Sequence, residues 1–556
     1  MFEKNLQYIN NEALKRRLLK LLPAETRIGV TYCVTPSNDY VLLKEDLPTD
    51  DLNNPREAIR NMLAKNIKQE MKPNDIIINF GIGLGYLLDE TFNNYPSRIY
   101  VYEPDLSLLH FVLSNVDISE HLASGRVYIT NDLDELTRYL SETFITKDKV
   151  EIAYLQNYAV VKNKELLMLT QRVYETCKCK MIDVSTIEKF STVWLENALN
   201  NISSFKGKKV CALSDLYNKY AGQTAVIAGA GPSLSDNIAN LQANRDKFII
   251  FAVNKSVKFL LRNGITPDFV VALDARNMDA TLGGLEEYFS RVNCIFDLRT
   301  DKSVMTKGFK QYFASFSSSD VIAKKLSEYN KFIQFNETGG TASTLGLISA
   351  IRMGFSKVVL AGVDLAFKDN TVYADGEVMQ RVSQEEIVAD GIKKNLVQVP
   401  SLRGGMVYTR DDYQAFIQHF ETIIKDANYS EVYNISSFGA LIKGVKNVKY
   451  EDLNLVSPII PINTDSIPEM NLDVKTFIED EFCNINNVIS LLSKEVFSPA
   501  LVSAIVKSTL LYQCMQADIV NALQKNMDSQ IAEEFIDKTK TAIRTVVEIL
   551  QKNKLI

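Results

Sequence analysis

The N-terminal part of the chain alternates short apolar runs with a stretch of helical periodicity. Residues 76–80 (IIINF), 98–102 (RIYVY) and 127–130 (VYIT) are apolar runs of strand length, whereas residues 55–71 carry apolar side chains at helical spacing. Strands and helices that alternate over such short connections predict a parallel sheet. We therefore predict a Rossmann-like domain over residues 1–165.

A second alternating pattern fills the middle of the chain, after a predicted helical connector at residues 166–206. Its strands are expected at residues 224–229, 248–253, 269–273, 292–296 and 357–361. Its helices are expected at residues 233–243, 255–263, 341–353 and 411–427. The alternation predicts a second doubly wound α/β unit over residues 207–455.

The C-terminal part of the chain has no run that resembles a strand. Residues 456–470 contain three prolines among polar residues and are typical of a linker. Beyond it, three stretches keep helical periodicity, at residues 474–494, 499–523 and 529–552. We predict a C-terminal helical domain over residues 456–556, which completes an α/β protein with two doubly wound units and a helical tail.

The composition is that of a mildly acidic globular protein. The chain has 556 residues, of which 46% are hydrophobic and 23% charged, and its formal net charge is −6. These values argue against a disordered chain and against a nucleic-acid binder. No signal-peptide pattern and no apolar run of about 18–20 residues is present, so we expect a cytoplasmic protein with neither membrane nor nucleic-acid partner. Its oligomeric state stays open.

Residues that commonly bind metals are scarce or scattered. The three histidines are His110, His121 and His419, and among the seven cysteines Cys177 and Cys179 form a lone C-x-C pair. A zinc site needs a second pair, so we predict no metal site and inert thiols. Whether a divalent metal takes part in the reaction stays open.

A first glycine loop follows the strand at residues 76–80. Gly81, Gly83 and Gly85 precede a helical pattern, and Glu103 ends the next strand. The spacing is closer to methyltransferase-like Rossmann domains than to G-x-G-x-x-G, and it fits a nucleotide or adenosyl-methionine site with the acid on the ribose. The alternative is a tight structural turn without a ligand. Both interpretations stay open.

A second glycine loop follows the strand at residues 224–229. It reads Gly229-Ala230-Gly231-Pro232-Ser233, with Pro232 expected at the first position of a helix and Ser233 in its first turn. The exposed N–H groups of such a helix start favour phosphate binding. A structural turn is the alternative, and the small side chains of this loop favour the phosphate.

Four further polar segments are expected at the same edge of the predicted sheet. Asn254 and Asp274 follow two neighbouring strands, and Asp364 follows the strand at residues 357–361. Gly340 and Thr341 lie at a glycine-rich helix start. Open α/β sheets bind ligands outside the carboxyl ends of their strands, so we expect these residues to converge on one site.

These motifs resemble those of the motility-associated-factor (Maf) glycosyltransferases. The resemblance rests on Gly229-Ala230-Gly231-Pro232-Ser233-Leu234, Gly264-Ile265-Thr266-Pro267-Asp268, Gly339-Gly340-Thr341, Gly362-Val363-Asp364-Leu365, Tyr433-Asn434 and Gly439-Ala440-Leu441-Ile442-Lys443-Gly444. The Gly81–Tyr86 loop and Glu103-Pro104-Asp105 resemble the N-terminal domain of the same family. The resemblance covers roughly residues 75–450, and the central motifs are specific only in combination.

The resemblance implies a cytoplasmic enzyme that glycosylates Ser or Thr of flagellin. The donor would be a CMP-activated nonulosonic acid of pseudaminic or legionaminic type, used as a substrate, with no tightly bound cofactor. The central domain would be similar to bacterial sialyltransferases. By this carry-over Gly229, Gly231, Pro232 and Ser233 hold the donor phosphate or ribose, Asn254 and Asp274 line the nucleotide pocket, and Gly340, Thr341 and Asp364 shape the sugar side.

The catalytic base is left open by one departure from the family pattern. Many relatives carry a histidine after the Gly-x-Asp-Leu motif, where this chain has Tyr373. Asp364, Asp274 and Tyr373 are therefore the candidate catalytic residues, although Tyr373 could also simply pack on the sugar. His419 falls inside a predicted helix without a motif around it and reads as a helix-face residue.

Two other functions remain as alternatives. The same central motifs resemble 6-hydroxymethylpterin diphosphokinase, a pyrophosphokinase that acts on a pterin with ATP and Mg²⁺, but that enzyme is much shorter than this chain. A non-catalytic module that binds flagellin through the C-terminal helices is the third interpretation, with both glycine loops structural. Binding of CMP would favour the glycosyltransferase over the non-catalytic module, and its absence would favour the module.

Overall fold

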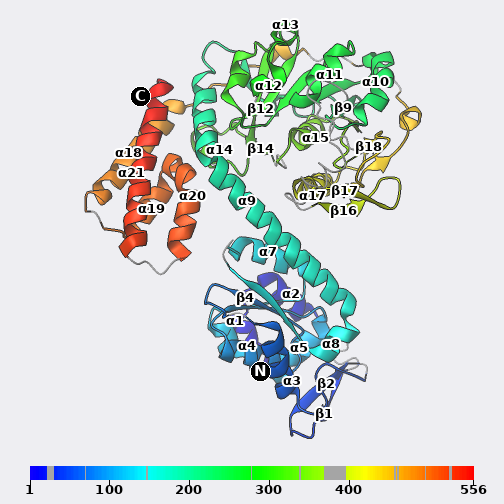
Figure 1. Ribbon diagram of the computed structural model, residues 1–556, viewed down its shortest axis with the longest axis vertical. Coiled ribbons are helices and arrows are strands. Elements are labelled where there is room, and N and C mark those ends of the chain that lie inside the picture. Colours follow the sequence, from blue (N-terminus) through cyan, green and yellow to red (C-terminus); the bar gives the residue numbers. More distant parts are fainter. Residues whose placement is uncertain are drawn as a thin grey trace. The chain divides into compact units, whose positions relative to one another are not determined.

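The computed structural model describes the chain apart from residues 22–29, 45, 69, 146–147, 277, 337–339, 368–395, 456–458, 460–462, 495 and 525–528. It divides into two compact units, Met1–Thr186 (unit 1) and Ile187–Ile556 (unit 2), and the division falls within helix α9 (Asn163–Ser203) (Figure 1). Each unit has its own parallel sheet. The four domain boundaries drawn from the sequence stay predictions.

Unit 1 contains a four-stranded parallel sheet in the order β6-β5-β4-β7. The strands are β4 (Ile76–Phe80), β5 (Arg98–Tyr102), β6 (Val127–Thr130) and β7 (Val150–Tyr154). An antiparallel meander of β1 (Val30–Val34), β2 (Tyr40–Lys44) and β3 (Leu47–Pro48) precedes them. The helices are α1 (Phe2–Tyr8), α2 (Glu12–Lys20), α3 (Pro55–Asn66), α4 (Tyr86–Asn94), α5 (Leu106–Asn115), α6 (Ser119–Ala123), α7 (Leu133–Thr143) and α8 (Gln156–Val161). The predicted Rossmann-like alternation is confirmed.

Unit 2 contains a ten-stranded sheet whose order is β14-β13-β12-β11-β10-β9-β15-β18-β19, with β8 beside β13. The strands are β8 (Val210–Ala212), β9 (Thr224–Ala228), β10 (Ile249–Val253), β11 (Phe269–Ala272), β12 (Asn293–Asp297), β13 (Gln311–Ser317), β14 (Phe335–Asn336), β15 (Lys357–Ala361), β18 (Val432–Asn434) and β19 (Lys446–Asn447). All their pairings are parallel. The predicted strands are confirmed to within about one residue at each end.

Helices cover both faces of this sheet because successive apolar side chains along each strand point to opposite faces. Ile227, Phe251 and Val271 belong to the apolar cluster that includes α15 (Ala342–Arg352) and α17 (Asp411–Asp426). Residues one position later along the same strands pack with the opposite layer of helices. That layer contains α10 (Leu234–Ala243), α11 (Val257–Arg262), α12 (Met278–Leu282), α13 (Glu286–Phe289) and α14 (Val321–Tyr329). A hairpin of β16 (Val397–Pro400) and β17 (Met406–Thr409) precedes α17 (Figure 1).

The C-terminal helices share the apolar cluster of the second layer. They are α18 (Val474–Leu492), α19 (Pro499–Lys507), α20 (Thr509–Gln524) and α21 (Ser529–Lys552). The single helix predicted at residues 499–523 is in fact two, α19 and α20. The buried Glu481 explains the break, because its carboxylate accepts hydrogen bonds from the Ser508 hydroxyl and from the first N–H groups of α20. Within the described part of the chain, each helix is too short or too polar to span a membrane.

Candidate functional site

The site begins where two neighbouring parallel strands of unit 2 end. Ala228 of β9 pairs with Ala361 of β15. In the sheet, the strand beyond β9 is β10, and the strand beyond β15, on the opposite side, is β18. Loops that leave such a pair diverge to opposite faces of the sheet and open a crevice, which is where open α/β sheets bind ligands. The glycine loop at residues 229–233 and the segment 362–365 both start at this point.

The two loops are in direct contact. Gly231 N–H donates to the Gly362 carbonyl over 2.7 Å, and Gly229 N–H donates to the Ala361 carbonyl over 2.8 Å. A Cβ atom on Gly231 would lie 2.6 Å from Asp364 Oδ2, and one on Gly229 would overlap the Gly362 carbonyl oxygen. The loop needs glycine at these positions because the neighbouring loop is so close.

Asp364 lies at the start of helix α10. Its Oδ2 accepts the Ser233 backbone N–H over 2.8 Å, and its Oδ1 accepts the Ser233 hydroxyl. The side chain is buried, with 2% of the residue exposed. A carboxylate in this place interacts favourably with the positive end of the helix dipole. Asp364 therefore already supplies an anion where the sequence predicts a bound phosphate.

Pro232 and Ser233 lie at other helix positions than the sequence predicts. Ser233 is the N-cap residue of α10 and not part of its first turn, and Pro232 precedes it. The helix therefore starts later than the position of Pro232 suggests. Phosphate binding by this loop stays a prediction, and the contacts favour a role in holding α10 against β15.

Two more parts of the chain donate hydrogen bonds to segment 362–365. Ala440 N–H donates to the Asp364 carbonyl over 2.8 Å, and the Thr409 hydroxyl donates to the Leu365 carbonyl over 2.7 Å. A Cβ atom on Gly439 would lie 2.6 Å from the Asp364 carbonyl oxygen. Loops from four parts of the sequence thus fix the floor of the crevice.

The structure brings the predicted pair Asn254 and Asp274 together. The Asn254 amide donates to Asp274 Oδ2 over 2.9 Å and lies 3.4 Å from the Thr281 hydroxyl. Asn254 is buried, whereas Asp274 is exposed at the carboxyl end of β11. The Ser256 hydroxyl donates to the Ala228 carbonyl, which ties the loop after β10 to the end of β9. Asp274 is thus an oriented carboxylate that a ligand in the crevice can reach.

Gly340 and Thr341 lie at the start of α15, which runs antiparallel to the strands and so begins at their carboxyl edge. The Thr341 hydroxyl accepts the Thr344 N–H over 3.1 Å and caps the helix. Gly340 is exposed and has a φ of +77°, which favours glycine. Tyr373 and residues 337–339 lie outside the described residues.

Sequence reasoning missed helix α17 as a neighbour of the site. A Cβ atom on Gly340 would lie 3.7 Å from the ring of Phe416 and 3.8 Å from His419 Nδ1. Nearer the start of α17, the ring of Tyr413 lies 6.2 Å from that of Phe367, which follows segment 362–365. The third-residue spacing of Tyr413, Phe416 and His419 was the available signal. This face of α17 joins the two glycine-rich segments of the site.

The first glycine loop, in unit 1, is surrounded by side chains of its own unit. Glu103 is fully buried and accepts hydrogen bonds from Ile82 N–H and the Tyr158 hydroxyl, and burial raises its pKa to about 7. A Cβ atom on Gly81 would lie 2.7 Å from the ring of Tyr158, and one on Gly83 would lie 2.7 Å from Asp50 Oδ2. Burial also raises the pKa of Asp50 to about 7. These contacts favour the interpretation as a structural turn.

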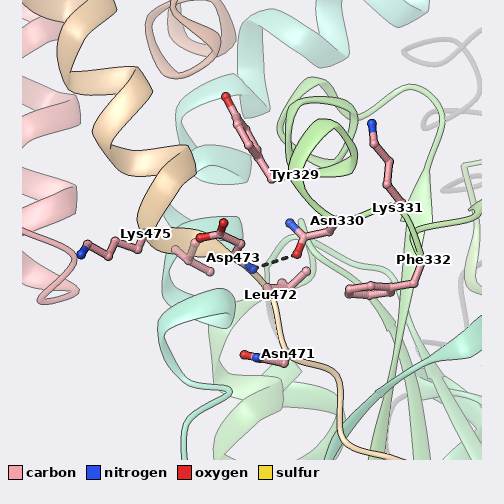
Figure 2. A pocket seen from close by; sticks show the side chains of 9 residues that line it. Tyr329, Asn330, Lys331, Phe332, Asn471, Leu472, Asp473 and Lys475 are labelled. Carbon is pink, nitrogen blue, oxygen red and sulfur yellow. Dashed lines mark hydrogen bonds between the residues drawn. The ribbon is translucent and has the colours of Figure 1, made fainter.

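A separate pocket of about 480 Å³ lies between the end of α14 and the start of α18 (Figure 2). Asp473 N–H donates to Asn330 Oδ1 between two of the lining residues, and Lys331 and Lys475 extend away from one another in the view. Since α14 runs antiparallel to the strands, its end lies at their amino edge, away from the crevice. Within the described ranges, no group of three or more His, Cys, Asp or Glu side chains could hold a metal ion.

Comparisons with known proteins agree with this fold. Residues 196–370 match a family model for 6-hydroxymethylpterin diphosphokinase MptE-like proteins. A solved structure of the MAf glycosyltransferase from Magnetospirillum magneticum AMB-1 superposes with a TM-score of 0.64, covering 99% of this chain and 95% of that chain at 16% identity. An uncharacterized protein of Treponema pallidum (strain Nichols) is 24% identical over 165 residues, which are 29% of this chain and 77% of that protein. The resemblance and the fold class predicted from the sequence are confirmed at the level of the fold.

Proposed function

We propose that this protein is a glycosyltransferase that transfers a nonulosonic acid from a CMP-activated donor to Ser or Thr of flagellin. The observation that carries the proposal is a fold shared over 99% of the chain with a Maf glycosyltransferase, together with the convergence of the sequence motifs on one edge of the central sheet. The acid type, the acceptor and the residue roles come from the resemblance. The crevice at the ends of β9 and β15 is the place where the donor binds in this proposal.

The proposal assigns complementary roles to the residues of the crevice. Asn254 and Asp274 line the nucleotide pocket, with the amide fixing the orientation of the carboxylate. Gly229, Gly231 and Ser233 form a rigid loop that Asp364 locks to β15. A rigid and partly dry site stabilises the departing CMP and the oxocarbenium charge that develops on the sugar. Gly340 and Thr341 shape the sugar side, where the acceptor hydroxyl must reach the anomeric carbon.

The experiment is a transfer reaction with purified components. Unglycosylated flagellin is incubated with the protein and with CMP-activated pseudaminic or legionaminic acid, and the intact mass of flagellin is measured. We expect the mass to rise by whole sugar residues, with release of one CMP per sugar. An unchanged mass with either donor, while CMP binds normally in calorimetry, contradicts the proposed reaction and leaves a binding protein.

The match of residues 196–370 to MptE-like proteins provides a second arm for the same experiment. A pyrophosphokinase would release AMP from ATP when 6-hydroxymethylpterin and Mg²⁺ are present. We expect no AMP above the level of a blank reaction. Adding EDTA to the sugar-transfer reaction shows whether transfer needs a divalent ion. Release of AMP that depends on the pterin would favour the kinase in place of the glycosyltransferase.

A further inference from the structure

Only one imidazole lies in the unit that contains the crevice. The chain has three histidines. In unit 1, the ring of His110 packs on Phe2 with 4.6 Å between centroids, and His121 Nε2 lies 3.1 Å from Asp89 Oδ1. His419 is the single histidine of residues 187–556, and it stands on α17. Within unit 2, a histidine base can therefore come from this one position.

His419 lies beside the start of α15, where the predicted site residues Gly340 and Thr341 stand. Helix α15 begins at the carboxyl edge of the strands, and α17 packs beside it (Figure 1). His419 Nδ1 and Cε1 both approach Gly340, the exposed residue that precedes the α15 cap, to 3.8 Å from an ideal Cβ. His419 is itself exposed, so a substrate can reach its ring. Phe416, one turn earlier, supplies an apolar surface next to it.

The other candidate bases are less suited to remove a proton from an acceptor. Asp364 is 2% exposed, and both of its carboxylate oxygens accept hydrogen bonds from Ser233. Asp274 is exposed, but its carboxylate accepts the Asn254 amide on the nucleotide side of the crevice. An imidazole is also the side chain that enzymes use most often to take a proton from a reacting group. These positions therefore favour an imidazole on the acceptor side as the base.

We propose that His419 is the general base that takes the proton from the acceptor hydroxyl. This inference rests on the proposed glycosyl transfer and names a residue outside the motif set that suggested it. In the step, the hydroxyl oxygen forms a bond to the anomeric carbon, and the bond from that carbon to the CMP phosphate oxygen breaks. The electron pair leaves with CMP, and the hydroxyl proton moves to a ring nitrogen of His419.

The test compares two variants of His419 with a matched control on the same helix. His419→Ala removes the ring, and His419→Gln keeps a polar side chain of similar reach that cannot accept a proton at neutral pH. Lys425→Ala changes an exposed residue on another side of α17 and serves as the control. Each protein is assayed for transfer to flagellin and, separately, for CMP affinity by calorimetry, with imidazole added to the His419→Ala reaction.

We expect both His419 variants to lose transfer by on the order of 10²–10⁴-fold, the usual contribution of a general base. CMP affinity stays within about threefold of wild type, since the base does not hold the nucleotide. Added imidazole restores part of the activity of His419→Ala, and Lys425→Ala transfers like wild type.

Three results overturn the inference, and they differ in what they leave standing. If both His419 variants transfer as wild type does, the base is another group and the glycosyltransferase function stands. If His419→Gln is active and imidazole gives no rescue, the ring has a structural role only. If wild type transfers no sugar, the proposed function falls, and this inference falls with it.

Discussion

Replacing Asp364 with asparagine removes one negative charge from the point where the central crevice is held together. The Asp364 carboxylate accepts the Ser233 N–H over 2.8 Å and the Ser233 hydroxyl at the start of α10. An asparagine keeps the shape but has only one acceptor oxygen, so its NH₂ group must face one of the two Ser233 donors. The substitution therefore leaves one buried donor without an acceptor.

The size of the effect follows from these contacts. A hydrogen bond to a charged group contributes about 1.5–3 kcal/mol, and a charge at a helix N-terminus contributes roughly 0.3–1 kcal/mol. Because Asp364 is 2% exposed, water can replace little of either contribution. We expect Asp364→Asn to lower the free energy of unfolding of unit 2 by about 2–4 kcal/mol. Asp274→Asn, at an exposed carboxylate, should cost less than about 1 kcal/mol.

The single tryptophan of the chain allows the free energy of unfolding to be measured for unit 2 alone. Trp194 stands on the part of α9 that belongs to unit 2, with the Arg299 guanidinium 5.2 Å from its ring centroid. Its fluorescence is followed in urea for wild type, Asp364→Asn, Ser233→Ala and the double variant. The cycle should give a coupling of about 0.5–3 kcal/mol. Additive losses, or an unchanged midpoint for Asp364→Asn, would refute the reasoning.

Three further predictions follow from the two glycine loops. Gly231→Ala should abolish transfer and weaken CMP binding because its Cβ would meet Asp364 Oδ2 at 2.6 Å. Gly308→Ala strains the backbone at a φ of +73° but its Cβ meets no atom, so it should retain both. In unit 1 the pKa of Glu103 is raised by burial to about 7, so its protonated form is favoured on folding. The contribution of Glu103 to stability should therefore be full below about pH 4.5 and fall by about 3 kcal/mol as the pH rises to 7. Glu103→Gln should remove this part of the pH dependence in urea unfolding followed by circular dichroism. Adenosyl-methionine should leave the hydrogen exchange of residues 81–85 unchanged because Tyr158 fills the space beside them; protection there would contradict this.

Local patterns in the sequence were enough to predict the sheet of unit 2. Buried parallel strands are short apolar runs, so β9, β10 and β15 could be found, and the expected meeting of Asn254 with Asp274 followed from strand ends that share one edge. The helical tail was also predictable, but the break between α19 and α20 was not. That break depends on Glu481, which lies more than one helix earlier in the sequence.

The contacts that define the candidate site depend on long-range packing. Asp364 accepts hydrogen bonds at the start of a helix whose N-cap residue is 131 positions away, so no local signal could show that its carboxylate lies there. Tyr158 lies 55 positions from Glu103, and only the fold brings it over the first glycine loop. His419 reads as an ordinary helix residue until α17 is placed against Gly340.

A crystal structure of the full chain with CMP tests the central claim most directly. We predict nucleotide density outside the carboxyl ends of β9, β10 and β11, with the cytidine or ribose next to Asn254 and Asp274 and the phosphate directed toward the side where His419 lies. Density at the Gly81–Gly85 loop, or in the pocket between α14 and α18, with the crevice empty, would contradict the account.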